Sequence, residues 1–128
     1  MSAGTPQKPT ILVVEDNVIN RELLLEYLSG PYNVLWAANG LDALELIESN
    51  LRTIKLVLLD IVMPGFNGFD VLEEMNSQGW IEYIPVVIVS SEGAETVRNE
   101  AYLHNVVDYI VKPFSPEEVL ACVRRILL

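Results

Sequence analysis

The stretch K-L-V-L-L-D-I-V-M-P-G-F-N-G-F-D, residues 55–70, decides the fold of this chain. It opens with a short apolar run, Lys55–Leu59, which is typical of a buried β-strand. The run stops at Asp60, and a loop rich in Pro, Gly and Asn follows. A carboxylate therefore sits where a buried strand ends, and in open α/β sheets ligands bind beyond the carboxyl ends of the strands. Taken alone, Asp60 could equally cap the turn that follows it.

The same pattern recurs along the chain, and it predicts five strands that alternate with five helices. The strands are expected at Thr10–Val14, Tyr32–Ala37, Lys55–Leu59, Pro85–Val89 and Val106–Val111. The helices are expected at Val18–Ser29, Leu41–Ser49, Gly68–Ser77, Ala94–Leu103 and Pro116–Leu127. Four of the strands are unbroken apolar runs, as in parallel strands that are covered on both faces. The chain is therefore predicted to fold as a three-layer, doubly wound α/β sandwich.

Length and composition limit the classes of protein to consider. A chain of 128 residues, 51% of them hydrophobic, is expected to form one domain, here residues 10–128 after a disordered tail over 1–9. The formal net charge of -10 argues against direct nucleic-acid binding. No apolar run approaches the roughly 20 residues that span a bilayer, and residues 1–9 do not resemble a signal peptide. We expect a soluble, cytoplasmic protein without membrane insertion, and its single cysteine, Cys122, cannot form an internal disulfide.

Polar side chains follow four of the predicted strands. Right-handed crossovers bring the carboxyl ends of parallel strands to one edge, so Glu15, Asp16, Asp60, Ser90 and Lys112 are expected to share a rim. Three carboxylates repel one another unless a positive charge lies among them. Mg²⁺ suits such a site because it prefers oxygen ligands. The chain has no Gly-rich phosphate loop and no Cys/His cluster.

These residue types are suited to phosphoryl transfer onto an aspartate. The carboxylate of Asp60 is the nucleophile and would form an acyl phosphate. A cation and Lys112 would stabilise the charge on the phosphoryl oxygens. Correct placement of the phosphoryl donor against the carboxylate would supply most of the remaining rate enhancement.

Four motifs together resemble the receiver domain of two-component response regulators, of the chemotaxis-regulator type. They are V-V-E-D-N at 13–17, L-L-D-I-V-M-P-G-F-N-G at 58–68, I-P-V-V-I-V-S at 84–90 and D-Y-I-V-K-P-F at 108–114. They occur in this order on the expected strand ends, and the resemblance extends over 10–128. It implies a flavodoxin-like fold whose five-stranded parallel sheet has the order 2-1-3-4-5.

The resemblance also implies a phosphoacceptor and a metal site. Asp60 would be the phosphoacceptor. Glu15, Asp16 and Asp60 would hold Mg²⁺, with the backbone carbonyl of Val62 as a further ligand and Mn²⁺ able to substitute. Glu15 and Asp16 could also act simply as helix-capping acids.

A second group of residues would transmit the effect of phosphorylation to the rest of the domain. By resemblance, Ser90 hydrogen-bonds the phosphoryl group, Lys112 pairs with Asp60 or its phosphate, and the Lys112-Pro113 peptide bond is cis. Tyr109 would turn inward when Ser90 moves, although it could also be a half-buried strand aromatic. Ser91 is the alternative to Ser90.

The two tryptophans and the single histidine are expected to have structural roles. Trp36 and Trp80 are expected to pack. His104 is expected to lie away from the rim, near the negative end of a helix, with no catalytic role.

The resemblance implies a signalling switch, not a conventional enzyme: the chain would catalyse only its own phosphorylation and slow dephosphorylation. The donor would be a histidine kinase or a histidine phosphotransfer protein. The output would be a downstream protein target, a fused output domain or a phosphorylation-dependent dimer. The chain would be a stand-alone receiver or part of a larger protein, and V-E-D-N-V-I-N-R at 14–21 favours a hybrid kinase.

Two other functions remain open at this point. An aspartate-nucleophile phosphohydrolase would place a second acid two residues after the nucleophile, where this chain has Val62. A degenerate receiver could act as a phosphorylation-independent adaptor, which the complete set of acids, Ser90 and Lys112 argues against.

Overall fold

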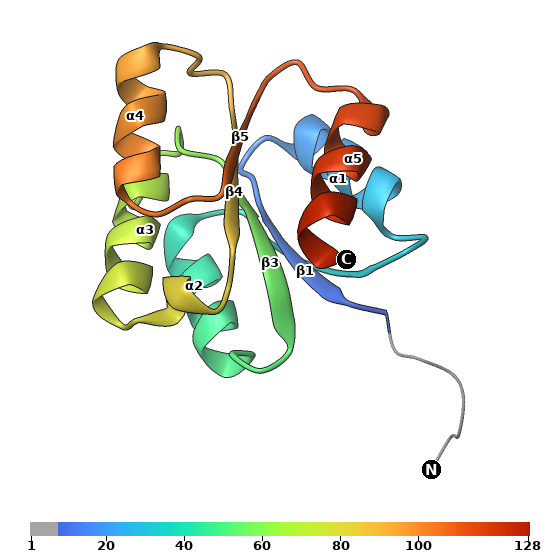
Figure 1. Cartoon of the computed structure of the whole chain (residues 1–128), viewed down its shortest axis with the longest axis horizontal. Helices are drawn as coiled ribbons and strands as arrows, with labels where there is room; N and C mark the ends of the chain where they lie inside the picture. The colour runs from blue at the N-terminus through green and yellow to red at the C-terminus, as the bar shows by residue number, and fades with distance from the viewer. Residues whose placement is uncertain (1–7) are drawn as a thin grey trace.

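A computed structural model describes residues 8–128 and contains one five-stranded parallel sheet in the order β2-β1-β3-β4-β5 (Figure 1). The strands are β1 (Thr10–Val14), β2 (Asn33–Ala37), β3 (Ile54–Leu59), β4 (Val86–Ser90) and β5 (Asp108–Val111). The helices are α1 (Val18–Leu28), α2 (Gly40–Ser49), α3 (Gly68–Ser77), α4 (Glu95–Leu103) and α5 (Pro116–Leu127). The predicted α/β fold and strand order are confirmed. The predicted tail over 1–9 lies mostly outside the described residues.

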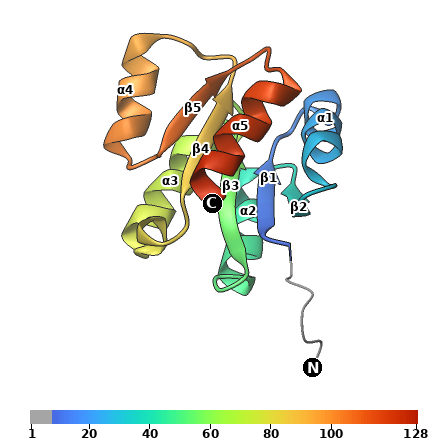
Figure 2. The ribbon, with the colours of Figure 1, turned by 45° about the vertical axis from the view of Figure 1, so that its right-hand side comes forward.

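The sheet is the middle of three layers. Helices α2, α3 and α4 lie on one face, and α1 and α5 lie on the other (Figures 1 and 2). Alternate residues of β1 enter opposite cores: Leu12 and Val14 face α2 and α3, whereas Ile11 and Val13 face α1 and α5. All four are at most 1% exposed. The unbroken apolar runs are therefore explained by burial of the central strands on both faces.

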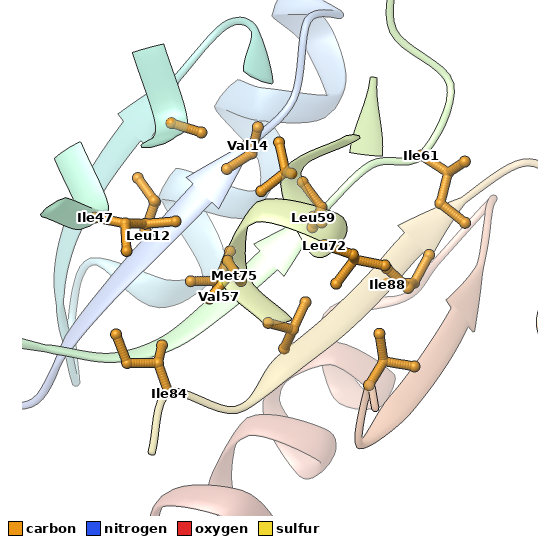
Figure 3. Close-up of a cluster of buried hydrophobic side chains, with 14 of the residues drawn as sticks. Leu12, Val14, Ile47, Val57, Leu59, Ile61, Leu72, Met75, Ile84 and Ile88 are labelled. Atoms are coloured by element: carbon orange, nitrogen blue, oxygen red, sulfur yellow. The ribbon is translucent and has the colours of Figure 1, made fainter. Parts of the chain in front are cut away.

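The larger core lies between the sheet and the helices α2 and α3. Figure 3 shows Leu12, Val57 and Leu59 of the sheet beside Ile47, Leu72 and Met75 of these helices. The same core continues to Ile61, in the loop that follows Asp60, which is 5% exposed. The loop is therefore anchored to the core by a buried side chain next to the strand end.

The structure corrects the predicted start of the last strand, which begins at Asp108 and not at Val106. Asn105 has a φ of 71°, the left-handed conformation expected at the end of a helix. The amide of Val106 still donates to the carbonyl of Ala101, so the chain turns out of α4 before the strand can begin. A short 3-10 helix, Trp80–Glu82, was not predicted.

The two tryptophans differ in their surroundings. Trp80 is 8% exposed and packs in the larger core, as expected. Trp36 lies on the edge strand β2, is 50% exposed and belongs to neither hydrophobic core. The guanidinium of Arg21 lies over its ring, 4.2 Å from the centroid.

Cys122 is predicted to be unreactive in the folded chain. It is 4% exposed, and its thiol donates to Asp108 Oδ2 at 3.3 Å. Burial, reinforced by the Asp108 carboxylate, raises the pKa of Cys122 from 9.0 to about 12. The thiolate fraction at pH 8.5 therefore falls by about three orders of magnitude. We expect iodoacetamide at pH 8.5 to label Cys122 only after urea unfolding, as measured by mass spectrometry; equal labelling rates in both states would contradict this.

Among the described residues, no helix is both long enough and apolar enough to cross a membrane.

Candidate functional site

The carboxyl ends of four strands bring the predicted rim residues together. Glu15 and Asp16 follow β1, Asp60 follows β3, Ser90 ends β4 and Lys112 follows β5. The amide of Asp60 donates to the carbonyl of Val14, and the amide of Lys112 donates to that of Ser90. These hydrogen bonds continue the sheet ladders by one step, so the rim is held by the sheet itself.

Three carboxylates converge at this rim. One carboxylate oxygen each from Glu15, Asp16 and Asp60 lie within 4.8 Å of one another. Glu15 and Asp60 are 1% and 3% exposed, whereas Asp16 is exposed to solvent. A set of hard oxygen donors that opens to water on one side suits Mg²⁺, which keeps several waters when it binds. The residues present therefore fit this ion.

Lys112 is shared by two of the three carboxylates. Its Nζ lies 2.6 Å from Glu15 Oε1 and donates to Asp60 Oδ2 at 3.2 Å. Burial lowers the pKa of Lys112, but Glu15 and Asp60 outweigh this effect and raise it overall. Burial raises the pKa of Glu15 to about 7, with a further contribution from the Asp60 charge, although Lys112 opposes both. The cluster thus contains three carboxylates and one ammonium, which contacts two of them, so its charge favours a further cation.

Ser90 and Tyr109 both contact Glu92, in the loop between β4 and α4. The Oγ of Ser90 accepts a hydrogen bond from the amide of Glu92 at 3.2 Å, and the hydroxyl of Tyr109 donates to the carbonyl of Glu92. Ser90 is fully buried and Tyr109 is 6% exposed, so its ring lies inward and is not a half-buried strand aromatic. Ser91, the alternative to Ser90, is exposed. Ser90 therefore holds the amide of this loop residue, and Tyr109 holds its carbonyl.

The loop after Asp60 is tightly tied to the start of α3. The amide of Val62 donates to Asp60 Oδ1 at 3.1 Å, which folds the loop back on the carboxylate. The side chain of Asn67 caps α3 and, with Asp70, forms a capping box. The Lys112-Pro113 peptide bond on the other side of the site is cis.

Sequence reasoning missed the role of Gly68. A Cβ on Gly68 would lie 2.5 Å from the carbonyl oxygen of Asp60 and 2.6 Å from Cα of Ile61. In the sequence Gly68 stands among other turn-forming residues, so its local signal was already explained by the turn.

The buried guanidinium of Arg21 was also missed. It donates through Nη1 to the carbonyl oxygen of Glu15 at 3.1 Å. Its signals were its place at the end of the motif V-E-D-N-V-I-N-R and its occurrence in a leucine-rich helix, and neither indicated a contact with Glu15. Its predicted neighbours on α1 gave no reason to place it beneath the acidic pair.

His104, the single histidine, lies away from this rim, as expected. His104 follows α4, and its Nδ1 lies 2.9 Å from the carbonyl oxygen of Glu100. Its ring is tilted against that of Phe69, with the centroids 5.5 Å apart. Its position agrees with a structural role at the end of a helix.

Comparison with known proteins gives consistent matches over nearly the whole chain. The family model for the response regulator receiver domain matches residues 11–124. Hybrid signal transduction histidine kinase D of Dictyostelium discoideum is 33% identical over 89% of this chain, which spans 7% of that kinase. Two-component response regulator ORR3 of Oryza sativa is 29% identical over 94% of this chain and 92% of its own length. The CheX-CheY-BeF3-Mg+2 complex from Borrelia burgdorferi contains a chain with a TM-score of 0.87 and 25% identity, covering 95% of this chain and 91% of that one.

Proposed function

Because this chain belongs to the response regulator receiver domain family, we propose that it is a phosphoacceptor switch that takes a phosphoryl group onto Asp60. The observation that carries the proposal is the position of Lys112, whose ammonium contacts both Glu15 and Asp60 at the strand ends. A buried aspartate beside a lysine and two further acids has the donor set that phosphoryl transfer requires. The donor would be a histidine kinase or a histidine phosphotransfer protein.

In the proposed reaction, a carboxylate oxygen of Asp60 attacks phosphorus while the bond from phosphorus to the donor breaks and the donor group leaves. The Lys112 ammonium, which already contacts Asp60, would then contact a phosphoryl oxygen. Mg²⁺ held by Glu15, Asp16, Asp60 and the backbone carbonyl of Val62 would neutralise charge on the phosphoryl oxygens. Mn²⁺ would substitute because it prefers the same carboxylate, carbonyl and water ligands.

The response would pass through the loop that carries Glu92. A phosphoryl group on Asp60 would compete for the Ser90 hydroxyl, which now accepts from the Glu92 amide. Loss of that hydrogen bond would shift the equilibrium between two positions of the loop. The Tyr109 side chain would move with the loop, because its hydroxyl donates to the carbonyl of Glu92. The surface formed by α4 and β5 would thereby change its affinity for a target, a fused output domain or a second copy.

The phosphohydrolase alternative has less support. Its second acid would stand at Val62, which is an apolar side chain, 52% exposed. The relatives include a hybrid kinase and a response regulator of nearly the same length as this chain, which supports two arrangements: a receiver within a larger protein and a stand-alone receiver. A cytoplasmic location remains a prediction.

The proposal is tested by intact-mass spectrometry of the wild-type chain after incubation with acetyl phosphate. We expect one phosphoryl adduct with Mg²⁺ present, little adduct with EDTA, and complete loss of the adduct in hydroxylamine, which cleaves acyl phosphates. Mg²⁺ binding without any adduct would support the adaptor alternative. An adduct that survives hydroxylamine would exclude an aspartyl phosphate.

A further inference from the structure

We propose that Arg21 is a positioning residue for the metal-binding acids and that Trp36 is the platform that holds it in place. This inference rests on the Mg²⁺ site of the proposed function. Arg21 lies on α1 and is 9% exposed. Its Nη1 donates to the carbonyl oxygen of Glu15 at 3.1 Å, and its guanidinium lies 4.2 Å from the centroid of the Trp36 ring.

Arg21 is a buried cation without a carboxylate partner. Among residues 8–128, the salt bridges involve only Lys112 and Arg125 as cations, and Nε of Arg21 has no hydrogen-bond partner. A buried, unpaired charge is costly. An apolar side chain of similar length could fill the same space at lower cost, so core packing alone does not account for an arginine here.

The contact with Glu15 accounts for it. The carbonyl of Glu15 belongs to the peptide unit that joins Glu15 to Asp16, two of the three acids at the rim. A hydrogen bond to this carbonyl restrains the peptide plane, and therefore the directions in which both carboxylates leave the backbone. Mutation of groups that orient metal ligands typically lowers metal affinity by about 10–100-fold.

Trp36 accounts for how the guanidinium keeps its orientation. The tryptophan lies on the edge strand β2 opposite Val13 of β1, and half of its surface is exposed. Its ring offers a flat, electron-rich face on which a planar guanidinium stacks. A lysine in place of Arg21 would keep the charge, but it would lose the planar stacking and the fixed direction of its donors.

Charge and positioning predict opposite effects of removing Arg21 on Mg²⁺ affinity. A nearby positive charge repels a cation, so charge alone predicts tighter Mg²⁺ binding in Arg21→Met. Loss of positioning predicts weaker binding. We expect positioning to dominate because the contact is a direct hydrogen bond to the peptide unit that carries two of the three metal-binding acids.

The test is a titration with MgCl₂ followed by two-dimensional NMR of the backbone amides of Asp16 and Asp60. We expect the Kd for Mg²⁺ to rise about ten-fold in Arg21→Met and in Arg21→Lys. Trp36→Ala is expected to weaken binding as well. The Arg21→Met/Trp36→Ala double variant should bind Mg²⁺ no more weakly than Arg21→Met alone. Trp36 acts only by holding Arg21 in place, so once Arg21 is gone its removal has no further effect.

Arg124→Met is the matched control, since it removes an exposed arginine of α5 and should leave the Kd unchanged. Urea unfolding of each variant separates metal affinity from stability. If Arg21→Met does not fold, Arg21→Lys and Trp36→Ala carry the test. Wild-type affinity or tighter binding in the folded Arg21 variants would overturn the inference. Failure of the wild-type chain to bind Mg²⁺ would instead overturn the proposed metal site.

Discussion

Asp60→Asn is expected to form no phosphoryl adduct with acetyl phosphate under conditions that modify the wild-type chain. The amide of asparagine has nearly the shape of the carboxylate but is not a nucleophile toward phosphorus, so the acyl phosphate cannot form. Intact-mass spectrometry measures the effect directly, and we expect it to be a complete loss and not a reduced rate.

The fold is expected to survive this substitution. Asp60 is buried beside Glu15, and its charge raises the pKa of Glu15, so removing that charge relieves a repulsion. Lys112 keeps its contact with Glu15. We therefore expect the free energy of unfolding of Asp60→Asn to equal or exceed that of the wild type, which links the lost adduct to the lost nucleophile and not to misfolding.

Asp42→Asn serves as the matched control because it changes an exposed carboxylate of α2 that is not one of the three clustered acids. It should form the adduct at the wild-type rate. An adduct of wild-type extent in Asp60→Asn would contradict the assignment and direct attention to Asp16 and Glu15 as nucleophiles.

Gly68→Ala is expected to destabilise the fold and to slow phosphorylation together. The added Cβ would lie 2.5 Å from the carbonyl oxygen of Asp60 and 2.6 Å from Cα of Ile61. These are backbone atoms, which cannot rotate away as the end of a side chain can. The amide of Gly68 also donates to the carbonyl of Ile61 at 3.0 Å, so α3 and the loop cannot separate without losing a hydrogen bond.

The expected cost is about 1–3 kcal/mol in the free energy of unfolding, the usual range for overpacking a filled site. Because the displaced backbone carries the phosphoacceptor, we also expect adduct formation to slow by up to about a hundred-fold. Urea denaturation and the time course of adduct formation measure the two effects separately.

Gly30→Ala is the matched control for this substitution. A Cβ on Gly30 would meet no atom within 4 Å, so its stability should be unchanged or slightly raised. A Gly68→Ala variant with the stability and reactivity of the Gly30→Ala variant would show that the loop after Asp60 is looser than its contacts indicate.

Much of the fold was predictable because its determinants are local. Apolar runs of strand length and helical periodicity depend on neighbouring residues, so the elements and their alternation followed from the chain alone. The parallel topology then placed Glu15, Asp60, Ser90 and Lys112 at one edge, because crossover handedness is a general rule. The boundary at Val106 was missed because its amide still donates to the carbonyl of Ala101 in α4, a contact that the β-branched sequence Val106-Val107 does not reveal.

The tertiary structure decided how the predicted residues share their contacts. Sequence reasoning allowed Lys112 to pair with Asp60 but did not foresee that it also contacts Glu15, since residues on different strands carry no local signal of their distance. The same holds for Gly68 against the Asp60 backbone and for Arg21 between Glu15 and Trp36. Periodicity specifies which face a residue occupies, whereas a contact between separate elements depends on how their side chains fill the space between them, and only the packed structure determines that.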